Sequence, residues 1–300
     1  MFKQNVKKTL VMLGLAIGVG VAANPAMAFS LGGYSGPVKL VFSNFDAGTV
    51  GYPFTPPAGT VGNVCNTIAG CDAAAGLPAP GTSWSEDTWG IFQIQAIENA
   101  VSGATLWSTG TGGERLTGMF GGLQDQSVTW NGGSSFTTGA VGGWMKVFLD
   151  TNNDYDGTPG AVLANPGRTG QYSYTGATEG SLFLDLIFGA GGALLGDLTS
   201  TYTSSFLQPS ITGAGNGHLN VVGGTNADMF DTNGMTDLNG GKHDLSFDVT
   251  LFAAGANSKW TATSAGQAQG NVPEPASLAL MGIGLLGLGA ASIRRKKKAS

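Results

Sequence analysis

The chain has 300 residues, 51 of them glycine, with 11% charged residues and a formal net charge of −5. Most cations lie near the two ends, so residues 29–272 hold 6 Lys and Arg against 18 Asp and Glu, a net charge of −12. A body this acidic repels nucleic acids and anionic lipids, which excludes both as partners, and it is compatible with divalent cations and neutral glycans.

The first 28 residues have the organisation of a secretory signal peptide. Three lysines form a basic start, an apolar stretch follows over residues 9–23, and Ala26 and Ala28 form an A-x-A cleavage signal. We expect the secretion machinery to export the chain and signal peptidase to cut after Ala28. The alternative is a retained N-terminal anchor.

The two cysteines, Cys65 and Cys71, are expected to form a local disulfide, because export places them in an oxidising compartment. A zinc site would need further ligands, and no histidine is close in sequence. Prolines are frequent in and around residues 52–83, so we interpret this segment as one long exposed loop.

Five segments of the body alternate apolar and polar residues with a period of two, which is typical of β-strands. They are VKLVF (38–42), IFQIQAI (91–97), WMKVFLD (144–150), SLFLDLIF (181–188) and LSFDVTLF (245–252). We therefore predict an all-β body over residues 29–260, an antiparallel β-sandwich or jelly roll without an internal domain boundary. A short helix within 181–196 is the local alternative.

Trp84 and Trp89 flank the sequence SEDT and form a candidate glycan-stacking site. Exposed aromatic rings pack on sugar rings, and Glu86 or Asp87 would accept hydrogen bonds from the sugar hydroxyls. The alternative is that Trp89, at the start of a strand, covers the core.

A candidate calcium site lies in DTNNDYDGTPG, where Asp150, Asn152, Asp154 and Asp156 place oxygen-bearing side chains at alternate positions. Calcium takes six to eight oxygen ligands, and alternate positions of a curling loop can point at one ion. The EF-hand pattern fails, because the twelfth position counted from Asn152 is Leu163 and not Glu. The alternative is a solvated turn rich in Asp and Asn.

Other candidate sites are weaker. The segment 223–230 fits most of a calcium-binding nonapeptide, but that unit works in tandem copies and only one is present, so a simple loop is favoured. The chain has two histidines, no G-x-S-x-G motif, and no spacing that singles out a pair of catalytic carboxylates. We expect no enzymatic activity.

The C-terminal region begins with residues 261–272, TATSAGQAQGNV, whose small polar composition predicts a flexible spacer. Residues 276–293 are uncharged, and as a helix about 27 Å long they would just cross a membrane. The five cations at 294–298 would stay in the cytoplasm, so the body would lie outside the inner membrane. A G-x-G-x-x-G match at 282–287 falls inside this apolar span, which excludes a nucleotide-binding loop there.

Pro273, Glu274 and Pro275, the apolar span and a basic cluster that begins with Arg294 and Arg295 together resemble the PEP-CTERM sorting signal. The same tail is also labelled an ice-binding protein C-terminal domain. The resemblance covers residues 273–300 and implies that an exosortase, itself a membrane protein, recognises Pro-Glu-Pro and removes the tail. Substrates of exosortase are exported surface or matrix proteins of Gram-negative bacteria that make exopolysaccharide.

The resemblance implies a secreted or cell-surface protein that passes through a transient inner-membrane-anchored intermediate. We expect a structural or adhesive role in an exopolysaccharide-associated biofilm or floc. One alternative is a carbohydrate-binding or ice-binding β-sandwich module, although no regular threonine repeat is present. A hydrolase acting on polysaccharide is the third interpretation.

Overall fold

The structure is a computed structural model that describes residues 29–47, 61–75, 86–155, 168–208, 210–255, 258 and 260–274. The chain divides into two compact units, residues 1–30 and 31–300, and the description below concerns the second. Several predictions fall outside the described residues: the signal peptide (1–28), Trp84, Asp156, Pro275, the membrane helix (276–293) and the basic cluster (294–298). Among the described residues, no helix has the length and apolar character needed to cross a membrane.

Among the described residues, eleven strands form one antiparallel sheet, and several short elements pack around it. The strands of the sheet are β1 (Gly36–Asp46), β2 (Gly62–Cys65), β3 (Thr88–Asn99), β4 (Thr105–Ser108), β5 (Arg115–Gly132), β6 (Ser135–Asp150), β9 (Ser181–Phe188), β10 (Tyr202–Leu207), β11 (Thr212–Gly223), β14 (Leu245–Ala253) and β15 (Ala262–Val272). The remaining elements are α1 (Ile68–Ala75), the 3-10 turn η1 (Thr111–Gly113), α3 (Ala227–Phe230), and the two-stranded ribbons β7 (Arg168–Gly170) with β8 (Ser173–Tyr174) and β12 (Met235–Thr236) with β13 (Lys242–His243).

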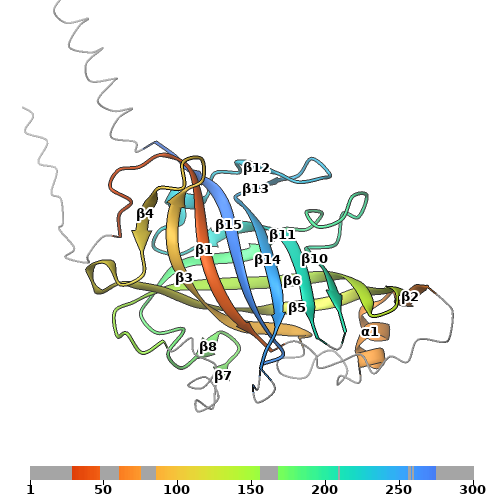
Figure 1. The fold of residues 1–300 in the computed structure, drawn as a ribbon. Helices are drawn as coiled ribbons and strands as arrows, with labels where there is room; N and C mark the ends of the chain where they lie inside the picture. Colours follow the sequence, from red (N-terminus) through yellow and green to blue (C-terminus); the bar gives the residue numbers. More distant parts are fainter. Residues whose placement is uncertain are drawn as a thin grey trace, which may run out of the picture. The chain divides into compact units, whose positions relative to one another are not determined.

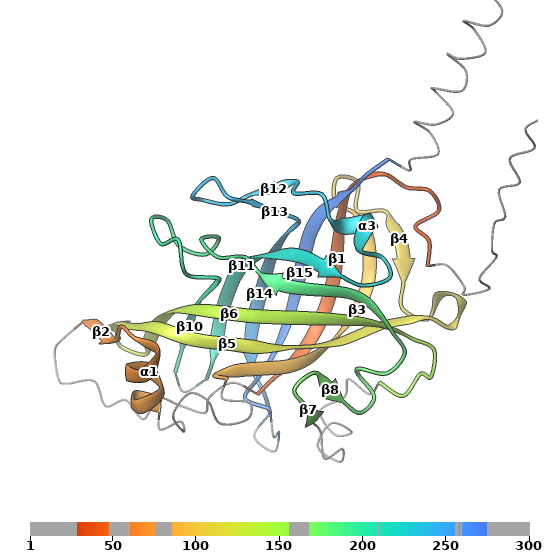
Figure 2. The same ribbon diagram turned by 180° about the vertical axis from the view of Figure 1, so that it is seen from behind.

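The strand pairings close on themselves. The order β6-β9-β11-β14-β15-β1-β3-β5 returns to its start because β5 also pairs with β6, and β10 pairs with both β6 and β11. In Figure 1 the strands β3, β1, β15, β14, β11 and β10 lie side by side, with the long strands β5 and β6 crossing behind them, and Figure 2 shows the same arrangement from the other side. The prediction of an antiparallel all-β body is confirmed, whereas the finer prediction of a sandwich or jelly roll is not confirmed.

The core fills the space enclosed by the sheet. Phe42 and Phe247 stack with ring centroids 5.4 Å apart, and Phe188 meets Phe247 edge-on at 5.4 Å. All three side chains are buried. They follow from the alternation in the sequence, since Phe42 and Phe247 occupy the apolar positions of two predicted strands.

The prediction of a flexible spacer over residues 261–272 is wrong, because residues 262–272 form the strand β15, which lies between β1 and β14. Its inner face carries mainly Ala, Ser and Gly, because side chains of the neighbouring strands fill the space. A Cβ at Gly266 would lie 2.5 Å from the Phe42 ring, and one at Gly270 would lie 2.3 Å from Leu245. The composition typical of a linker is here a requirement of close strand packing.

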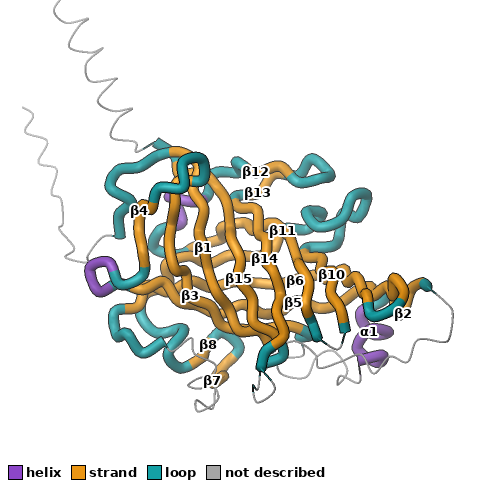
Figure 3. The backbone as a smooth tube through the Cα atoms, in the orientation of Figure 1, coloured by secondary structure: helices purple, strands orange, loops and turns teal. Residues whose placement is uncertain are grey.

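The segment 52–83, expected to be one exposed loop, contains β2 and α1 (Figure 3). Cys65 ends β2 and Cys71 lies in α1, and a disulfide joins them with a Cα–Cα separation of 5.2 Å, as the sequence leads one to expect. Both cysteines pack against Val128 and Phe136 of the β5–β6 pair. The alternative of a helix at 181–196 is also wrong over 181–188, which form strand β9.

Candidate functional site

The sorting segment follows the sheet directly. Asn271 and Val272, the last residues of β15, pair with Pro37 and Gly36 of β1. Pro273 comes next and, because proline has no N–H to donate, it cannot extend the strand pairing. The Pro-Glu-Pro motif therefore begins directly after the last residue of a strand that belongs to the folded sheet.

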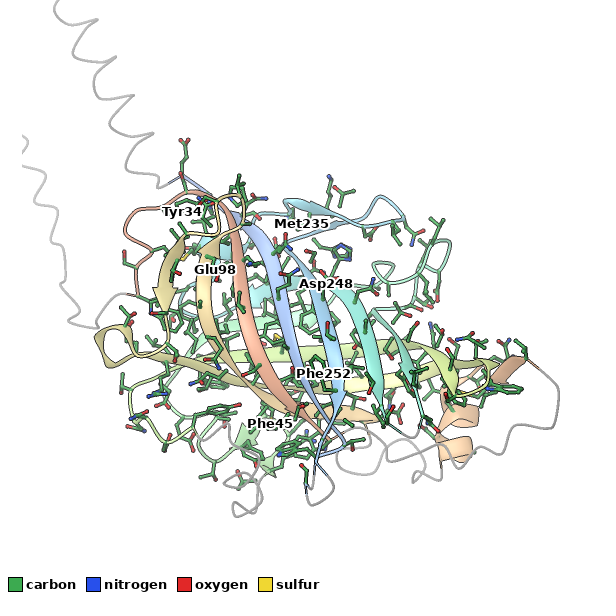
Figure 4. The ribbon with its side chains drawn as sticks, viewed as in Figure 1. Tyr34, Phe45, Glu98, Met235, Asp248 and Phe252 are labelled. Carbon is green, nitrogen blue, oxygen red and sulfur yellow. A yellow bond between two sulfur atoms is a disulfide. The ribbon has the colours of Figure 1, made fainter. Side chains whose placement is uncertain are left out.

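A broad groove with a volume of about 720 Å³ lies on the outer face of the sheet. It crosses β1, β15, β14, β11 and β10, and Leu194, from the loop after β9, also lines it. Figure 4 labels Asp248 on β14, in the middle of these strands. The face is the outer one because residues of the opposite alternation, such as Phe42 and Phe247, point into the core.

One continuous row of side chains, polar except for Val41, crosses the groove. The row consists of register partners on five adjacent strands, so their side chains point to the same face. In strand order they are Val41, Gln267, Asp248, Asn216 and Thr203. Neighbouring members of the row are about 4.8 Å apart, the spacing of paired strands. In the described part of the chain, the side chains of Gln267, Asp248 and Asn216 have no hydrogen-bond partner.

A second row runs beside the first and consists of small residues. Its members are again register partners on the same five strands, namely Ser43, Ala265, Thr250, Ala214 and Ser205. The hydroxyl of Ser205 lies 3.3 Å from that of a threonine on β6, which continues the row onto a sixth strand. Within the groove this row supplies Ala265, Thr250, Ala214 and Ser205, whereas Ser43 lies outside it.

The charges at the groove differ in their environment. Lys39, at one edge, is neutralised by Glu98 of β3, with Nζ 2.8 Å from Oε2. Asp248 lies in the middle of the groove, is exposed, and has no ion-pair partner in the described part of the chain. Among the described residues that line the groove, Asp248 therefore carries the one uncompensated charge, which is negative.

A second polar site, which the sequence reasoning missed, lies inside the closed sheet. A cavity of about 80 Å³, space for a few water molecules, is lined by Asp46, Asp125, Thr138, Tyr202 and Ser204, among others. The Oδ1 atom of Asp46 is buried, and no described residue donates a hydrogen bond to it. The sequence contains an indication of this buried acid, because Asp46 continues the inward-facing alternation of Val38, Leu40 and Phe42 along β1 (Figure 1).

Burial perturbs the acids and phenols around this cavity. It raises the pKa of Asp46 from its usual 3.8 to about 7. Burial also raises the pKa of Tyr202, and the negative charges of Asp46 and Asp125 raise it further. Asp87, at the same end of the sheet, has its pKa raised to about 6, mainly by burial and in part by Asp72, against the lowering effect of a hydrogen bond from the Asp125 N–H. These groups therefore keep their protons to a higher pH than the same groups do in water.

The predicted calcium loop is only partly described. Asp150 is buried at the end of β6, and its Oδ1 accepts a hydrogen bond from the N–H of Asn152 at 2.8 Å, which is the geometry of an Asx turn. Burial raises the pKa of Asp150, and the charges of Asp154 and Glu179 raise it further. No group of three or more acidic, histidine or cysteine side chains in the described ranges is placed to hold a metal ion. Calcium binding stays a prediction, and Asp156 is outside the described residues.

Trp89 is part of an aromatic cluster at the end of the sheet near β7 and β8. Its ring lies 5.5 Å from that of Trp260 and 6.3 Å from that of Tyr174, and the guanidinium of Arg168 covers it at 4.9 Å. Arg168 also pairs with Glu86, and both of these side chains are almost fully buried. With these contacts Trp89 packs as the alternative interpretation expected. The glycan-stacking role of Trp84 and Trp89 stays a prediction, because Trp84 is not among the described residues.

In the weaker calcium candidate, residues 227–230 form the short helix α3. Phe230 is fully buried, in edge contact with Phe183 at 6.2 Å. The backbone of Gly224 has φ +108, and a Cβ there would lie 2.4 Å from the Phe183 carbonyl oxygen. The glycine and the phenylalanine thus have packing roles, and the segment is a turn between strands.

The comparisons with known proteins identify the tail. A family model described as the PEP-CTERM protein-sorting motif matches residues 271–296, which begin with the last two residues of β15. No curated protein and no solved structure matches the chain, and the ice-binding label receives no support. The motif indicates exosortase-dependent export toward the cell surface through a membrane-anchored intermediate. On the evidence of this tail, the chain is a PEP-CTERM protein.

Proposed function

We propose that the protein is a structural or adhesive component of an extracellular matrix, a biofilm or floc rich in exopolysaccharide, made by a Gram-negative bacterium. The observation that carries the proposal is the sorting motif at residues 271–296, joined without a spacer to the folded body. A tail that delivers a protein to the cell surface leaves the body as the working part. The body is proposed to act by binding and not by catalysis.

Three features of the body support this role. The closed sheet leaves few unpaired strand edges, which protects an exported protein from uncontrolled edge-to-edge association. The disulfide between Cys65 and Cys71 suits an oxidising compartment. The outer face of the sheet is lined with hydroxyl and amide side chains, which form hydrogen bonds with hydrated polymers.

Replacing Pro273, Glu274 and Pro275 by alanine is expected to block removal of the tail. The exosortase would lose its recognition sequence, while the strand pairing of β15 would be unchanged. Immunoblots of separated membrane and extracellular fractions should then show the longer form of the protein retained with the membrane. Alanine at Gln267 and Gln269, on the outer face of β15, serves as a control and should leave release intact. Release of a shortened product from the triple variant would contradict the proposal.

Carbohydrate binding by the body is a second candidate function. The observation that favours it is the groove, whose row includes amide and carboxylate groups that have no hydrogen-bond partner among the described residues. The two functions are compatible, because a matrix protein that binds matrix polysaccharide would be adhesive by that means.

A further inference from the structure

We propose that the groove on the outer face of the sheet binds a neutral polysaccharide chain. The inference rests on the proposed function because that function places the protein outside the cell, among polysaccharides. The chemistry of the ligand is argued from the residues of the groove. The groove described above is a feature of the folded sheet and is independent of the sorting tail.

The central row has the groups that recognise polyols. Asn216 and Gln267 each offer an amide that both donates and accepts, and Asp248 between them offers two acceptor oxygens. A sugar ring carries neighbouring hydroxyls that do the same, so planar side chains can each bind a pair of hydroxyls. Because these three side chains have no hydrogen-bond partner in the described part of the chain, binding would break no protein contact there.

The floor of the groove complements the less polar faces of a sugar. Ala214 and Ala265 carry only a methyl group, and Val41 adds an apolar surface at the end of the central row. Small side chains allow close approach of a flat ring whose faces carry C–H groups. A volume of about 720 Å³ falls in the range of about 300–1,000 Å³ that is typical of ligand sites.

The length of the row indicates a chain and not a single sugar. The four polar members, from Gln267 on β15 to Thr203 on β10, lie on four adjacent strands. At about 4.8 Å per strand they extend over roughly 14 Å. A polymer that lies across the strands would place successive units over successive members of the row.

The charges disfavour an anionic ligand. Asp248 is the one uncompensated charge at the described surface of the groove, since Lys39 is paired with Glu98. The surrounding body has a net charge of −12 over residues 29–272. An acidic polysaccharide or an acidic protein would be repelled at this site, and a second copy of the chain would bring like charges together.

The test measures binding by affinity electrophoresis, using protein recovered from cells that express the full chain, from whichever fraction contains it. The probes are four neutral polymers, namely dextran, mannan, galactomannan and hydroxyethylcellulose, and one anionic polymer, alginate. At least one neutral polymer should retard the protein, and alginate should not. The double variant Asn216→Ala/Gln267→Ala should bind about tenfold more weakly, which corresponds to the loss of the hydrogen bonds made by two side chains.

Gln269→Ala is the matched control. Gln269 lies on the same strand and the same face as Gln267 but outside the groove, so its loss should leave binding unchanged. Thermal unfolding of each variant verifies that the sheet is intact.

Four results would overturn the inference: no retardation by any neutral polymer, stronger binding to alginate, equal weakening by Gln269→Ala, or self-association that the double variant abolishes. The last result would assign the face to a second copy of the chain. Binding by a protein that never leaves the cell would contradict the proposed function and keep the groove assignment. An exported protein that binds no neutral polymer would overturn the groove assignment alone.

Discussion

A chain that ends at residue 261 is expected to lose its fold, whereas a chain that ends at residue 274 should keep it. The difference between them is β15, which pairs with 11 residues of β1 and with 9 residues of β14. Its removal would open the closed sheet and expose Phe42 and Phe247 to water. A typical domain is stabilised by only roughly 5–15 kcal/mol, so the loss of a strand from the middle of the closed sheet is expected to unfold it. Far-UV circular dichroism and thermal unfolding of the two chains measure the effect.

A point substitution tests the same strand without a truncation. Ala268 is buried between Leu40 and Phe247, its register partners, so Ala268→Asp would place a charge in the core. We expect a loss of about 3 kcal/mol or more from the free energy of unfolding. Gln269→Asp, on the outer face of the same strand, is the control and should cost less than about 1 kcal/mol.

A cooperative, unchanged unfolding transition in the chain that ends at 261 would contradict the placement of β15.

Asp46→Asn is expected to make the protein more stable at pH 8 and to leave its stability nearly unchanged at pH 4. In the folded state burial raises the pKa of Asp46 from 3.8 to about 7, so between these values the folded protein holds a proton that the unfolded chain has released. Stability therefore falls as the pH rises through this window, and the penalty is fully present above pH 7. Asparagine has no charge to bury, so the variant avoids the penalty.

The size of the Asp46 effect follows from the pKa change. At 1.36 kcal/mol per pKa unit, the penalty is at most about 4 kcal/mol, and water in the adjoining cavity reduces it. Urea denaturation of parent and variant at pH 4, 6 and 8 should show a difference that grows with pH. Asp248→Asn, on the exposed outer face of β14, should show no such trend. Equal stability of the Asp46→Asn variant and its parent at pH 8 would show that the carboxylate is solvated.

The sequence predicts the strands that carry their own apolar face. The five predicted segments fall within β1, β3, β6, β9 and β14. The strands β5, β11 and β15 were not predicted, because their glycines interrupt the alternation. Gly118 of β5 shows the reason: a Cβ there would lie 2.4 Å from the ring of Phe92 and 2.2 Å from the Lys146 carbonyl oxygen. In these strands the apolar volume comes from a neighbour, and a pattern read along one strand does not contain it.

The groove and the cavity depend on contacts that are distant in sequence. The central row of the groove joins Val41 on β1 to Thr203 on β10 through three intervening strands. Each member alone is an ordinary outward-facing residue of its strand. Asp46 could have been noticed, since it is an acid in phase with the buried face of β1. The sorting tail was recognised because its signal is local and linear.

The position of the sorting motif connects the fold to delivery. Because the matched residues begin within β15, the folded body reaches the edge of the Pro-Glu-Pro sequence. A released protein that ends near this point would retain the whole of β15 and therefore the closed sheet. Removal of the tail is then compatible with a stable extracellular body.

The central claim is that export and removal of the tail deliver an intact β body outside the cell. Mass spectrometry of the protein released at the cell surface tests it most directly, because it gives both ends of the mature chain. The account predicts an N-terminus near Phe29 and a C-terminus near Pro275, with Val272 and the rest of β15 retained. A released chain that still extends beyond Arg294 would contradict it.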